Sequence, residues 1–506
     1  MTIGDYSGRR ALYSPDKLAL IDTGKTPELR LTYGQLNDRA VRLANRLRAA
    51  GIGFGDRVAI LALDGVEHLD CFFACSKLGA LHTVLNWRLH WRELAAVLAQ
   101  TTPKVLIFSD EFRETFAELQ AENIPGPDLT IHLDGEGIPG SEPWQAILRD
   151  GDPAAVYDPR IDESATAALL LTGGTTGAPK AARITHGMIA WNTLNTVIHD
   201  LHHDDIYLNV FPLFHTGGLF VYTLPQFILG GTTVLMRRFD PDRTLELIER
   251  ERVTVFAAVP TIYQALAACP GWPAADLSSL RFCTSGGAPL PVPLVHKYVD
   301  EKGIRFKQGF GMTEFGPGVF ALAPEDAVRK AGSIGRPNFF VSARVVDDDN
   351  RPLGPGKIGE LALKGPSRSA GYFNDPQATA EATDTEGWFH TGDLARVDEE
   401  GYFTIVDRKK DMFISGGENV YPAEIEAALY RHPAVHLCAV IGVPDAKWGE
   451  VGLACVVLKA NVQAGPAELL AFLRDNLARY KVPRRVEILD ALPLSGAGKV
   501  LKRELH

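Results

Sequence analysis

The chain has 506 residues, of which 46% are hydrophobic and 23% are charged, and its formal net charge is -10. Because this length exceeds what one hydrophobic core usually holds, we expect several domains. The negative charge disfavours a nucleic-acid-binding surface, and no apolar run approaches the ~20 residues that a membrane span needs.

We expect a soluble, cytoplasmic protein, which the net charge of -10 fits. No basic-then-apolar signal segment follows Met1. Cys71 and Cys75 are four residues apart in a helical pattern, with no ligand partners nearby, and no CxxC pair occurs. We interpret all six cysteines as small core residues. They are Cys71, Cys75, Cys269, Cys283, Cys438 and Cys455.

Residues 29–110 alternate between strand-like and helix-like patterns. A helix from Tyr33 to Ala50 should stop at Gly51, and a second, about Val66 to Leu78, should end near Gly79. Apolar runs at 56–61, 81–85 and 105–108 predict strands, and 94–98 predicts the start of a third helix. This alternation predicts a parallel sheet that is covered on both faces. Residues 112–160 have weak periodicity and predict peripheral structure.

A strand-like run, Ala167 to Leu171, ends in a turn rich in Gly and Thr that finishes at Lys180. Glycines let the backbone approach a ligand closely, and successive N–H groups in such a turn can bind an anion. Thr172, Thr175 and Thr176 add hydroxyl donors, and Lys180 adds a charge that suits phosphate. The turn is not a Walker A loop, because Ala181 follows the lysine. Taken alone, it is equally compatible with a plain surface loop.

Further strands also run into polar or Gly-rich turns. A helix should follow Thr185, its N-cap, and the contiguous residues 202–205 predict a solvated loop and not a metal site. His215 precedes Gly217 and Gly218, which should leave room for a ligand. Strands at 254–259 and 280–284 come next, the second ending in the turn Ser285 to Leu290. Because ligands bind outside the carboxyl ends of parallel strands, these joints can line one crevice.

The segment from Gln308 to Glu314 supplies an aromatic face, a hydroxyl and a carboxylate within a few residues. From about Val341 the pattern predicts a small antiparallel β unit, in which residues 347–350 form a hairpin turn and not a calcium site. The charged run 407–411 separates two apolar strands and predicts a domain boundary. Beyond it, helices and strands predict a compact α+β unit of roughly a hundred residues.

These motifs, in this order, resemble the adenylate-forming superfamily over essentially the whole chain, and most closely its bacterial acyl-CoA synthetases. The resemblance implies an α/β fold with a large N-terminal domain of two doubly wound sheets plus a small distorted β-barrel. It further implies a smaller, mobile α+β C-terminal domain. We therefore expect an N-terminal domain at 1–407, a hinge at 408–411 and a C-terminal lid at 412–506.

The resemblance also implies the reaction: an acid and ATP form an acyl-adenylate and pyrophosphate, and the thiol of CoA then displaces AMP. Lys499, His215, Thr313 and Glu314 match catalytic positions, and Glu314 with Thr176 would bind Mg²⁺, which prefers oxygen ligands. The ATP-binding positions are Thr172, Gly173, Gly174, Thr175, Thr176, Gly177, Lys180, Ser285, Gly286, Gly287, Ala288, Pro289, Gln308, Phe310, Gly311, Met312, Thr313, Asp393 and Arg408. The family usually has Ser at Gly173 and Tyr at Phe310.

Two other sets of positions follow from the same resemblance. Lys410 occupies the hinge position, where some relatives carry Asp. The acyl pocket would comprise His215, Gly217, Gly218, Leu219, Val259, Gly287 and Gly311. The CoA site would comprise Gly416, Gly417, Glu418, Trp448, Tyr480 and Arg484.

The resemblance leaves the identity of the carboxylic acid substrate open. The pocket segments contain no Lys or Arg, so we expect an apolar substrate, first a medium- or long-chain fatty acid and alternatively a benzoate- or cinnamate-type acid. Gly218→Trp should then favour shorter acids. An enzyme that loads a carrier protein is a further alternative, and His215 argues against an amino-acid substrate, because amino-acid-activating relatives usually carry Asp there. A catalytically dead binding protein is disfavoured by Lys499, Glu314 and Asp393. We expect no membrane span and, by analogy, a homodimer.

Overall fold

The computed structural model describes residues 3–121, 126–172, 180–288, 290–415, 418–445, 447–494 and 500–505. Local sequence signals explain where many of its helices begin and end. Thr32 and Gln35 form a reciprocal capping box at the start of α2 (Tyr33–Ala49), and Gly79, at φ 67°, terminates α3 (Val66–Leu78). The predicted N-cap Thr185 accepts a hydrogen bond from Met188 N at the start of α7 (His186–Ile198).

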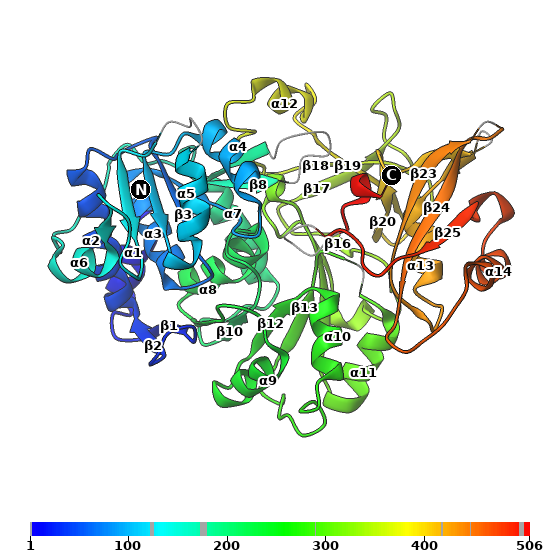
Figure 1. Ribbon diagram of the computed structural model, residues 1–506, viewed down its shortest axis with the longest axis horizontal. Coiled ribbons are helices and arrows are strands. Elements are labelled where there is room, and N and C mark those ends of the chain that lie inside the picture. The colour runs from blue at the N-terminus through cyan, green and yellow to red at the C-terminus, as the bar shows by residue number, and fades with distance from the viewer. Residues whose placement is uncertain are drawn as a thin grey trace. The chain divides into compact units, whose positions relative to one another are not determined.

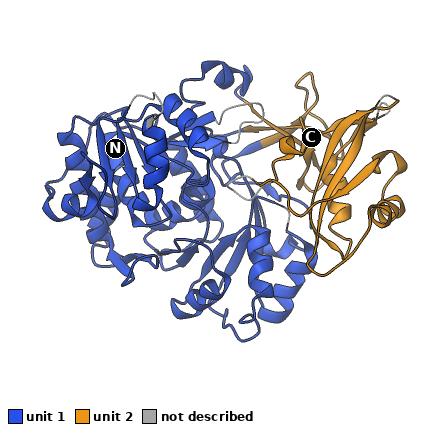
Figure 2. Ribbon diagram, viewed as in Figure 1, with its two compact units in different colours: residues 1–342, 364–387 blue, residues 343–363, 388–506 orange. Residues whose placement is uncertain are grey.

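The chain divides into two compact units, which are described separately (Figures 1 and 2). Unit 1 contains residues 1–342 and 364–387, and unit 2 contains residues 343–363 and 388–506. The small β unit is therefore grouped with the C-terminal residues. The expected hinge at 408–411 lies inside unit 2 and stays a prediction about motion.

Unit 1 contains two large, mainly parallel sheets, as predicted. The first has seven strands in the order β7-β6-β5-β3-β4-β8-β9, and only β8 and β9 pair antiparallel. Helix α2 leads into its strand β3, and helices α3 and α4 (Trp91–Thr101) connect β3 to β4 and β4 to β5. The strands are β3 (Arg57–Leu61), β4 (Leu81–Val84), β5 (Val105–Phe108), β6 (Leu129–His132), β7 (Glu142–Pro143), β8 (Thr166–Thr172) and β9 (Lys180–Thr185).

The second sheet of unit 1 has nine strands in the order β16-β15-β14-β13-β12-β10-β11-β1-β2. Its central strands are parallel, and helices α9 (Pro241–Arg250), α10 (Pro260–Ala268) and α11 (Val292–Lys302) connect them. The strands are β1 (Leu18–Asp22), β2 (Leu29–Thr32), β10 (Ile206–Asn209), β11 (Thr232–Leu235), β12 (Val255–Ala258), β13 (Phe282–Ser285), β14 (Phe306–Phe310), β15 (Phe320–Leu322) and β16 (Arg336–Pro337).

The two faces of this second sheet have different coverings. On one face, α10 and α11 pack over Phe256, Cys283 and Phe306. The other face carries Phe282 and is covered by the segment from Phe211 to α8 (Thr223–Leu229), which includes a short π-helix, η2 (Gly217–Val221). The carboxyl ends of β10, β12, β13 and β14 therefore open at one edge, where the sequence places its candidate site residues.

Unit 2 contains two antiparallel sheets. The first has the order β17-β18-β19-β20 and forms a sheet where we expect a distorted barrel. The second has the order β22-β21-β24-β23, with β25 added parallel to β24, and two helices, α13 (Pro422–Leu429) and α14 (Pro466–Asn476), pack on it. The strands are β17 (Ser342–Val346), β18 (Gly359–Lys364), β19 (Phe389–Val397), β20 (Phe403–Arg408), β21 (Phe413–Ser415), β22 (Glu418–Val420), β23 (Val435–Asp445), β24 (Gly449–Leu458) and β25 (Arg485–Ile488).

Candidate active site

In unit 1, Lys180 and Glu314 are linked through a tyrosine that the sequence analysis does not single out. The Tyr372 hydroxyl donates to Glu314 Oε1 at 3.0 Å, and Lys180 Nζ lies 5.1 Å from the centroid of the Tyr372 ring. Burial and the Glu314 charge raise the pKa of Tyr372, so its hydroxyl stays protonated. A bridge between Ala182 and Tyr372 fixes this position. Only the fold brings Tyr372 here, because 58 residues separate it from Glu314.

The end of β14 presents the residues predicted to contact the nucleotide. Gln308 pairs with Ser285 of β13, and Gln308 Oε1 accepts a long hydrogen bond, 3.4 Å, from Leu290 N. Phe310 ends the strand with a half-buried ring, 5.8 Å from Phe320. A Cβ on Gly311 would lie 1.8 Å from Pro317 O, so only glycine fits there. Thr313 follows in a short 3-10 helix, η3 (Thr313–Phe315).

His215 lies in the loop that leads into η2. Gly217 N donates to His215 Nδ1 at 3.0 Å, so the neutral ring carries its proton on Nε2. The preceding loop is held by Asp64, whose carboxylate accepts a hydrogen bond from Leu213 N at 2.8 Å. Burial raises the pKa of Asp64 to about 7, although the Leu213 bond opposes this.

The glycines beside His215 differ in what they leave open. A Cβ on Gly217 would lie 3.1 Å from His215 Nδ1, whereas a Cβ on Gly218 would lie 2.2 Å from Pro212 O. The expectation that Gly218 leaves free volume is therefore wrong, since the backbone of Pro212 occupies that space. Leu219 is completely buried in the core that includes Phe214. A Cβ on Gly287 would make only an ordinary contact, 3.4 Å from Val259 Cγ1, although its φ of 81° favours glycine.

The face of the sheet below η2 carries polar groups that the sequence analysis does not predict. Thr284 and Lys307 are paired in register and therefore lie on one face of β13 and β14. The Tyr222 hydroxyl lies 2.7 Å from Thr284 Oγ1, and Lys307 Nζ lies 3.5 Å from the centroid of the Phe282 ring. Burial lowers the pKa of Lys307 to about 8. We call Tyr222, Thr284 and Lys307 the polar triad.

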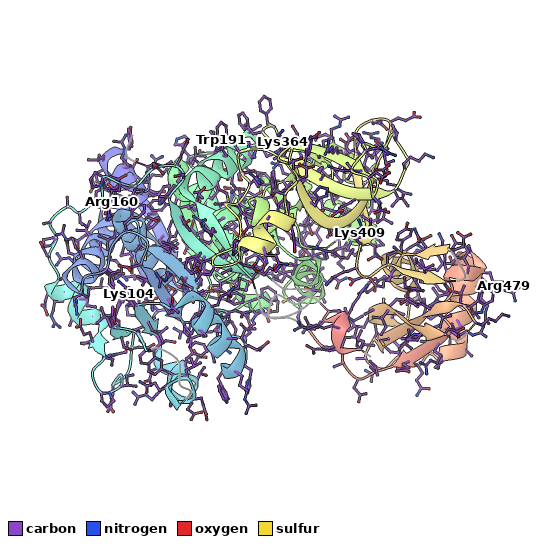
Figure 3. All side chains as sticks on the ribbon, turned by 90° about the horizontal axis from the view of Figure 1, so that it is seen from above. Lys104, Arg160, Trp191, Lys364, Lys409 and Arg479 are labelled. Atoms are coloured by element: carbon purple, nitrogen blue, oxygen red, sulfur yellow. The ribbon has the colours of Figure 1, made fainter. Side chains whose placement is uncertain are left out.

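In unit 2, Asp393 and Arg408 are opposite each other on β19 and β20, and Arg408 Nε donates to Asp393 Oδ1 at 2.7 Å. Asp393 is 2% exposed. The chain then turns through residues 409–411 before β21. Lys409, labelled in Figure 3, forms ion pairs with Asp348 at 3.0 Å and Glu360 at 3.3 Å. Burial lowers the pKa of Lys410, and the charges of Arg408, Arg503 and Lys502 act in the same direction.

The described residues of the predicted CoA site lie in unit 2. Trp448 and Tyr480 are 42% and 44% exposed, and Glu418 is also exposed. Arg484 N donates to Gly452 O, which joins the start of β25 to β24. Several other predicted residues lie outside the described residues: Gly173, Gly174, Thr175, Thr176, Gly177, Pro289, Gly416, Gly417 and Lys499.

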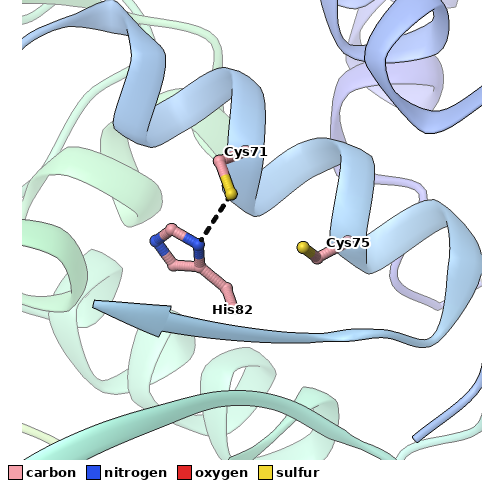
Figure 4. Close-up of side chains that lie close together, drawn as sticks. All are labelled: Cys71, Cys75 and His82. Carbon is pink, nitrogen blue, oxygen red and sulfur yellow. Dashed lines mark hydrogen bonds between the residues drawn. The ribbon is translucent and has the colours of Figure 1, made fainter. Parts of the chain in front are cut away.

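Two side-chain clusters show how the fold uses residues with metal-binding chemistry. All six cysteines are buried and free, as predicted, but Cys71 and Cys75 do have a neighbour, His82 (Figure 4). His82 Nδ1 lies 3.3 Å from Cys71 Sγ, and burial raises the pKa of the Cys71 thiol and lowers the pKa of His82, so both groups stay neutral. Residues 202–204 are exposed as predicted, whereas Asp205 is 2% exposed and forms an ion pair with Arg281 at 2.7 Å.

Comparison with known proteins identifies the family. The family model "AMP-binding enzyme" matches residues 8–373, and the model "AMP-binding enzyme C-terminal domain" matches residues 424–499. The chain belongs to the AMP-binding enzyme family. It is an AMP-forming acid–thiol ligase, an acyl-CoA synthetase.

Individual relatives align along the full chain. A feruloyl-CoA synthase of Amycolatopsis sp is 45% identical, covering 100% of this chain and 98% of that one. A long-chain-fatty-acid–CoA ligase of Mycobacterium tuberculosis is 36% identical with the same coverage. The ATP-bound crystal structure of MatB from Rhodopseudomonas palustris has a TM-score of 0.89 and 32% identity, covering 99% of this chain and 98% of that one. No helix among the described residues is both long and apolar enough to cross a membrane.

Proposed function

We propose that this acyl-CoA synthetase activates an aromatic carboxylic acid of the cinnamate or benzoate type. The higher identity to a feruloyl-CoA synthase, 45% against 36% for the fatty-acid ligase, supports this alternative over our first expectation of a fatty acid. The observation that carries the proposal is the polar triad below η2. An extended alkyl chain that ran down this face would meet the Lys307 ammonium, and covering this charge with an alkyl chain in place of water costs free energy.

Space for an added carbon lies at Gly309, between the strand ends and the polar triad. A Cβ on Gly309 would meet only Thr284 Cγ2 at 3.7 Å and Ser285 O at 4.0 Å within contact range. Gly309 follows Lys307 by two residues, which corresponds to ~7 Å along a strand. Phe211 and Val221, which are half-buried, pack near this face and supply apolar walls. This combination suits a planar ring.

We infer roles in this reaction for several of the predicted site residues. The Glu314 carboxylate, held by Tyr372, fits Mg²⁺, because this ion prefers carboxylate oxygens. When bound, Mg²⁺ would neutralise charge on the ATP phosphates. Lys180 would bind phosphate, Asp393 would accept hydrogen bonds from the ribose hydroxyls, and Lys499 would bridge the substrate carboxylate and the α-phosphate. The exposed rings of Trp448 and Tyr480 would contact CoA.

We also propose that residues 408–411 are a hinge that lets residues 412–506 change position between the two half-reactions. The turn at 409–411 and the exposed Lys410 support this. Proline fixes φ near −65°, so Lys410→Pro should preserve one half-reaction and impair the other by at least about tenfold. Separate assays of acyl-AMP formation and CoA transfer would check this, and wild-type rates in both would place the boundary elsewhere. We further propose that the protein forms a homodimer and is located in the cytoplasm.

A panel of acids tests the substrate class. Pyrophosphate release would be measured with and without CoA for cinnamate, 4-hydroxycinnamate, benzoate, octanoate, malonate and acetate. We expect cinnamate-type acids to give the highest kcat/KM and malonate to be poor, since a second carboxylate would be buried. A preference for octanoate would contradict the aromatic assignment, and turnover that requires a carrier protein in place of CoA would favour the carrier-loading alternative.

A further inference from the structure

The polar triad has hydrogen-bonding capacity beyond its internal contacts. Tyr222 and Thr284 each have one hydroxyl hydrogen, and a single hydrogen bond of 2.7 Å joins them. One hydroxyl hydrogen and several lone pairs are therefore left for another partner. Tyr222 is 6% exposed, and Thr284 is half-buried near the carboxyl end of β13. Burial raises the pKa of Tyr222 to about 12, so its hydroxyl stays a donor at neutral pH.

Lys307 adds a cation at the same face. Its Nζ donates to His199 O and lies over the Phe282 ring, and an ammonium group has three donors. Asp200 and Asp205 attract the Lys307 charge electrostatically, but both form their ion pairs with Arg281. Among the described residues, only His199 O is recorded as a hydrogen-bond acceptor for this ammonium.

We propose that Tyr222, Thr284 and Lys307 together bind an oxygen substituent, a hydroxyl or methoxy group, on the aromatic ring at the end remote from the carboxylate. This inference rests on the proposed aromatic substrate and adds the substitution of its ring. Thr284 and Lys307 donate to the oxygen, Tyr222 donates to Thr284, and a ring hydroxyl donates in turn to the Tyr222 oxygen. The site therefore distinguishes an oxygenated ring from a bare or methylated one.

The position of the triad along the strands supports this assignment. The carboxylate must lie near the carboxyl ends of β13 and β14, where Gly287 and Gly311 are located. Lys307 precedes Gly311 by four residues on the same chain segment, or ~13 Å for an extended strand. The Tyr222–Thr284 pair lies at this distance, because Thr284 is paired with Lys307, and the Lys307 ammonium lies farther from Gly311, over the ring of Phe282. An acid with a ring and a short unsaturated linker spans such a distance, whereas acetate does not.

The test compares three acids of one shape: cinnamate, 4-methylcinnamate and 4-hydroxycinnamate. The measured quantity is the ratio of kcat/KM for the hydroxylated acid to kcat/KM for the methylated acid. We expect a ratio well above one for the wild type, and a fall of about tenfold in Thr284→Val, Tyr222→Phe and Lys307→Met. The kcat/KM for 4-methylcinnamate should stay constant or rise, which separates lost recognition from lost folding. Lys307→Arg should keep part of the preference.

Tyr207→Phe is the matched control. Tyr207 is buried beside Tyr222, with ring centroids 5.4 Å apart, but its hydroxyl donates to Asn209 Oδ1. We expect its ratio to equal that of the wild type. An unchanged ratio in all three triad variants, or an equal fall in Tyr207→Phe, would overturn the inference while cinnamate turnover still supports the aromatic function. Activity with octanoate and none with any aromatic acid would overturn both.

Discussion

Units 1 and 2 hold their candidate site residues in different ways. In unit 1, these residues follow the ends of parallel strands, and close backbone packing sets their positions, as at Gly311 against Pro317 and Gly218 against Pro212. In unit 2, Asp393 and Arg408 are paired across an antiparallel ladder and joined by an ion pair. The unit 1 site should therefore be sensitive to added atoms, and the unit 2 site to the removal of charge.

The largest expected effect comes from removing a positive charge from unit 2. Lys499→Ala should reduce acyl-AMP formation by at least about 10²-fold, because a group aimed at developing transition-state charge is typically worth this much. CoA transfer from a supplied acyl-adenylate should be little changed. Measuring the two half-reactions separately checks this, and an equal loss of both would show that Lys499 has a general structural role.

A single added methyl group tests the unit 1 side of the comparison. Gly311→Ala should lower the free energy of unfolding by about 1–3 kcal/mol and reduce turnover strongly, because its Cβ would overlap Pro317 O. The matched control is Gly309→Ala, where the nearest atom would be 3.7 Å away. Thermal melting should separate the two variants. Similar melting temperatures would mean that the loop at Gly311 relaxes easily.

The complementary test removes the charge of a carboxylate in unit 2 and keeps the volume of its side chain. Asp393→Asn should raise the KM for ATP by about 10-fold or more, since a charge-assisted hydrogen bond contributes about 1.5–3 kcal/mol. Asp348→Asn is the control, because Asp348 is 94% exposed on its side chain and pairs only at the surface with Lys409. Steady-state kinetics with varied ATP would measure both. An unchanged KM in Asp393→Asn would make the Arg408 pair purely structural.

The smallest expected effect is on the pH dependence of folding stability, through Asp64 near His215. Burial raises the pKa of Asp64 from 3.8 to about 7, so between these values the folded chain holds a proton that the unfolded chain has released. The contribution of Asp64 to stability is therefore present below about pH 4 and is lost as pH rises through about 7. The melting temperature of Asp64→Asn minus that of the wild type should therefore increase by a few degrees between pH 5.5 and pH 8. A constant difference would contradict the raised pKa.

Sequence patterns were sufficient for the overall class of fold and for part of the secondary structure. The capped helix after Thr185, the helix that stops at Gly79 and the parallel strands β3, β4 and β5 all agree with prediction. These features depend on local chemistry: capping hydroxyls, glycine at positive φ and apolar periodicity. The expected space at Gly218 was wrong because the carbonyl of Pro212 fills it, and that contact depends on how the loop folds back.

The sequence by itself determined the reaction class, because the residues of adenylate chemistry occur in fixed short motifs such as the one from Gln308 to Glu314. Only the tertiary structure revealed Tyr372 between Lys180 and Glu314, and Tyr222, Thr284 and Lys307 on one face below η2. These groups come from different elements, and no local pattern marks them. Their contacts arise from strand register and from the segment that covers the sheet, so the features proposed to select the acid depend on long-range packing.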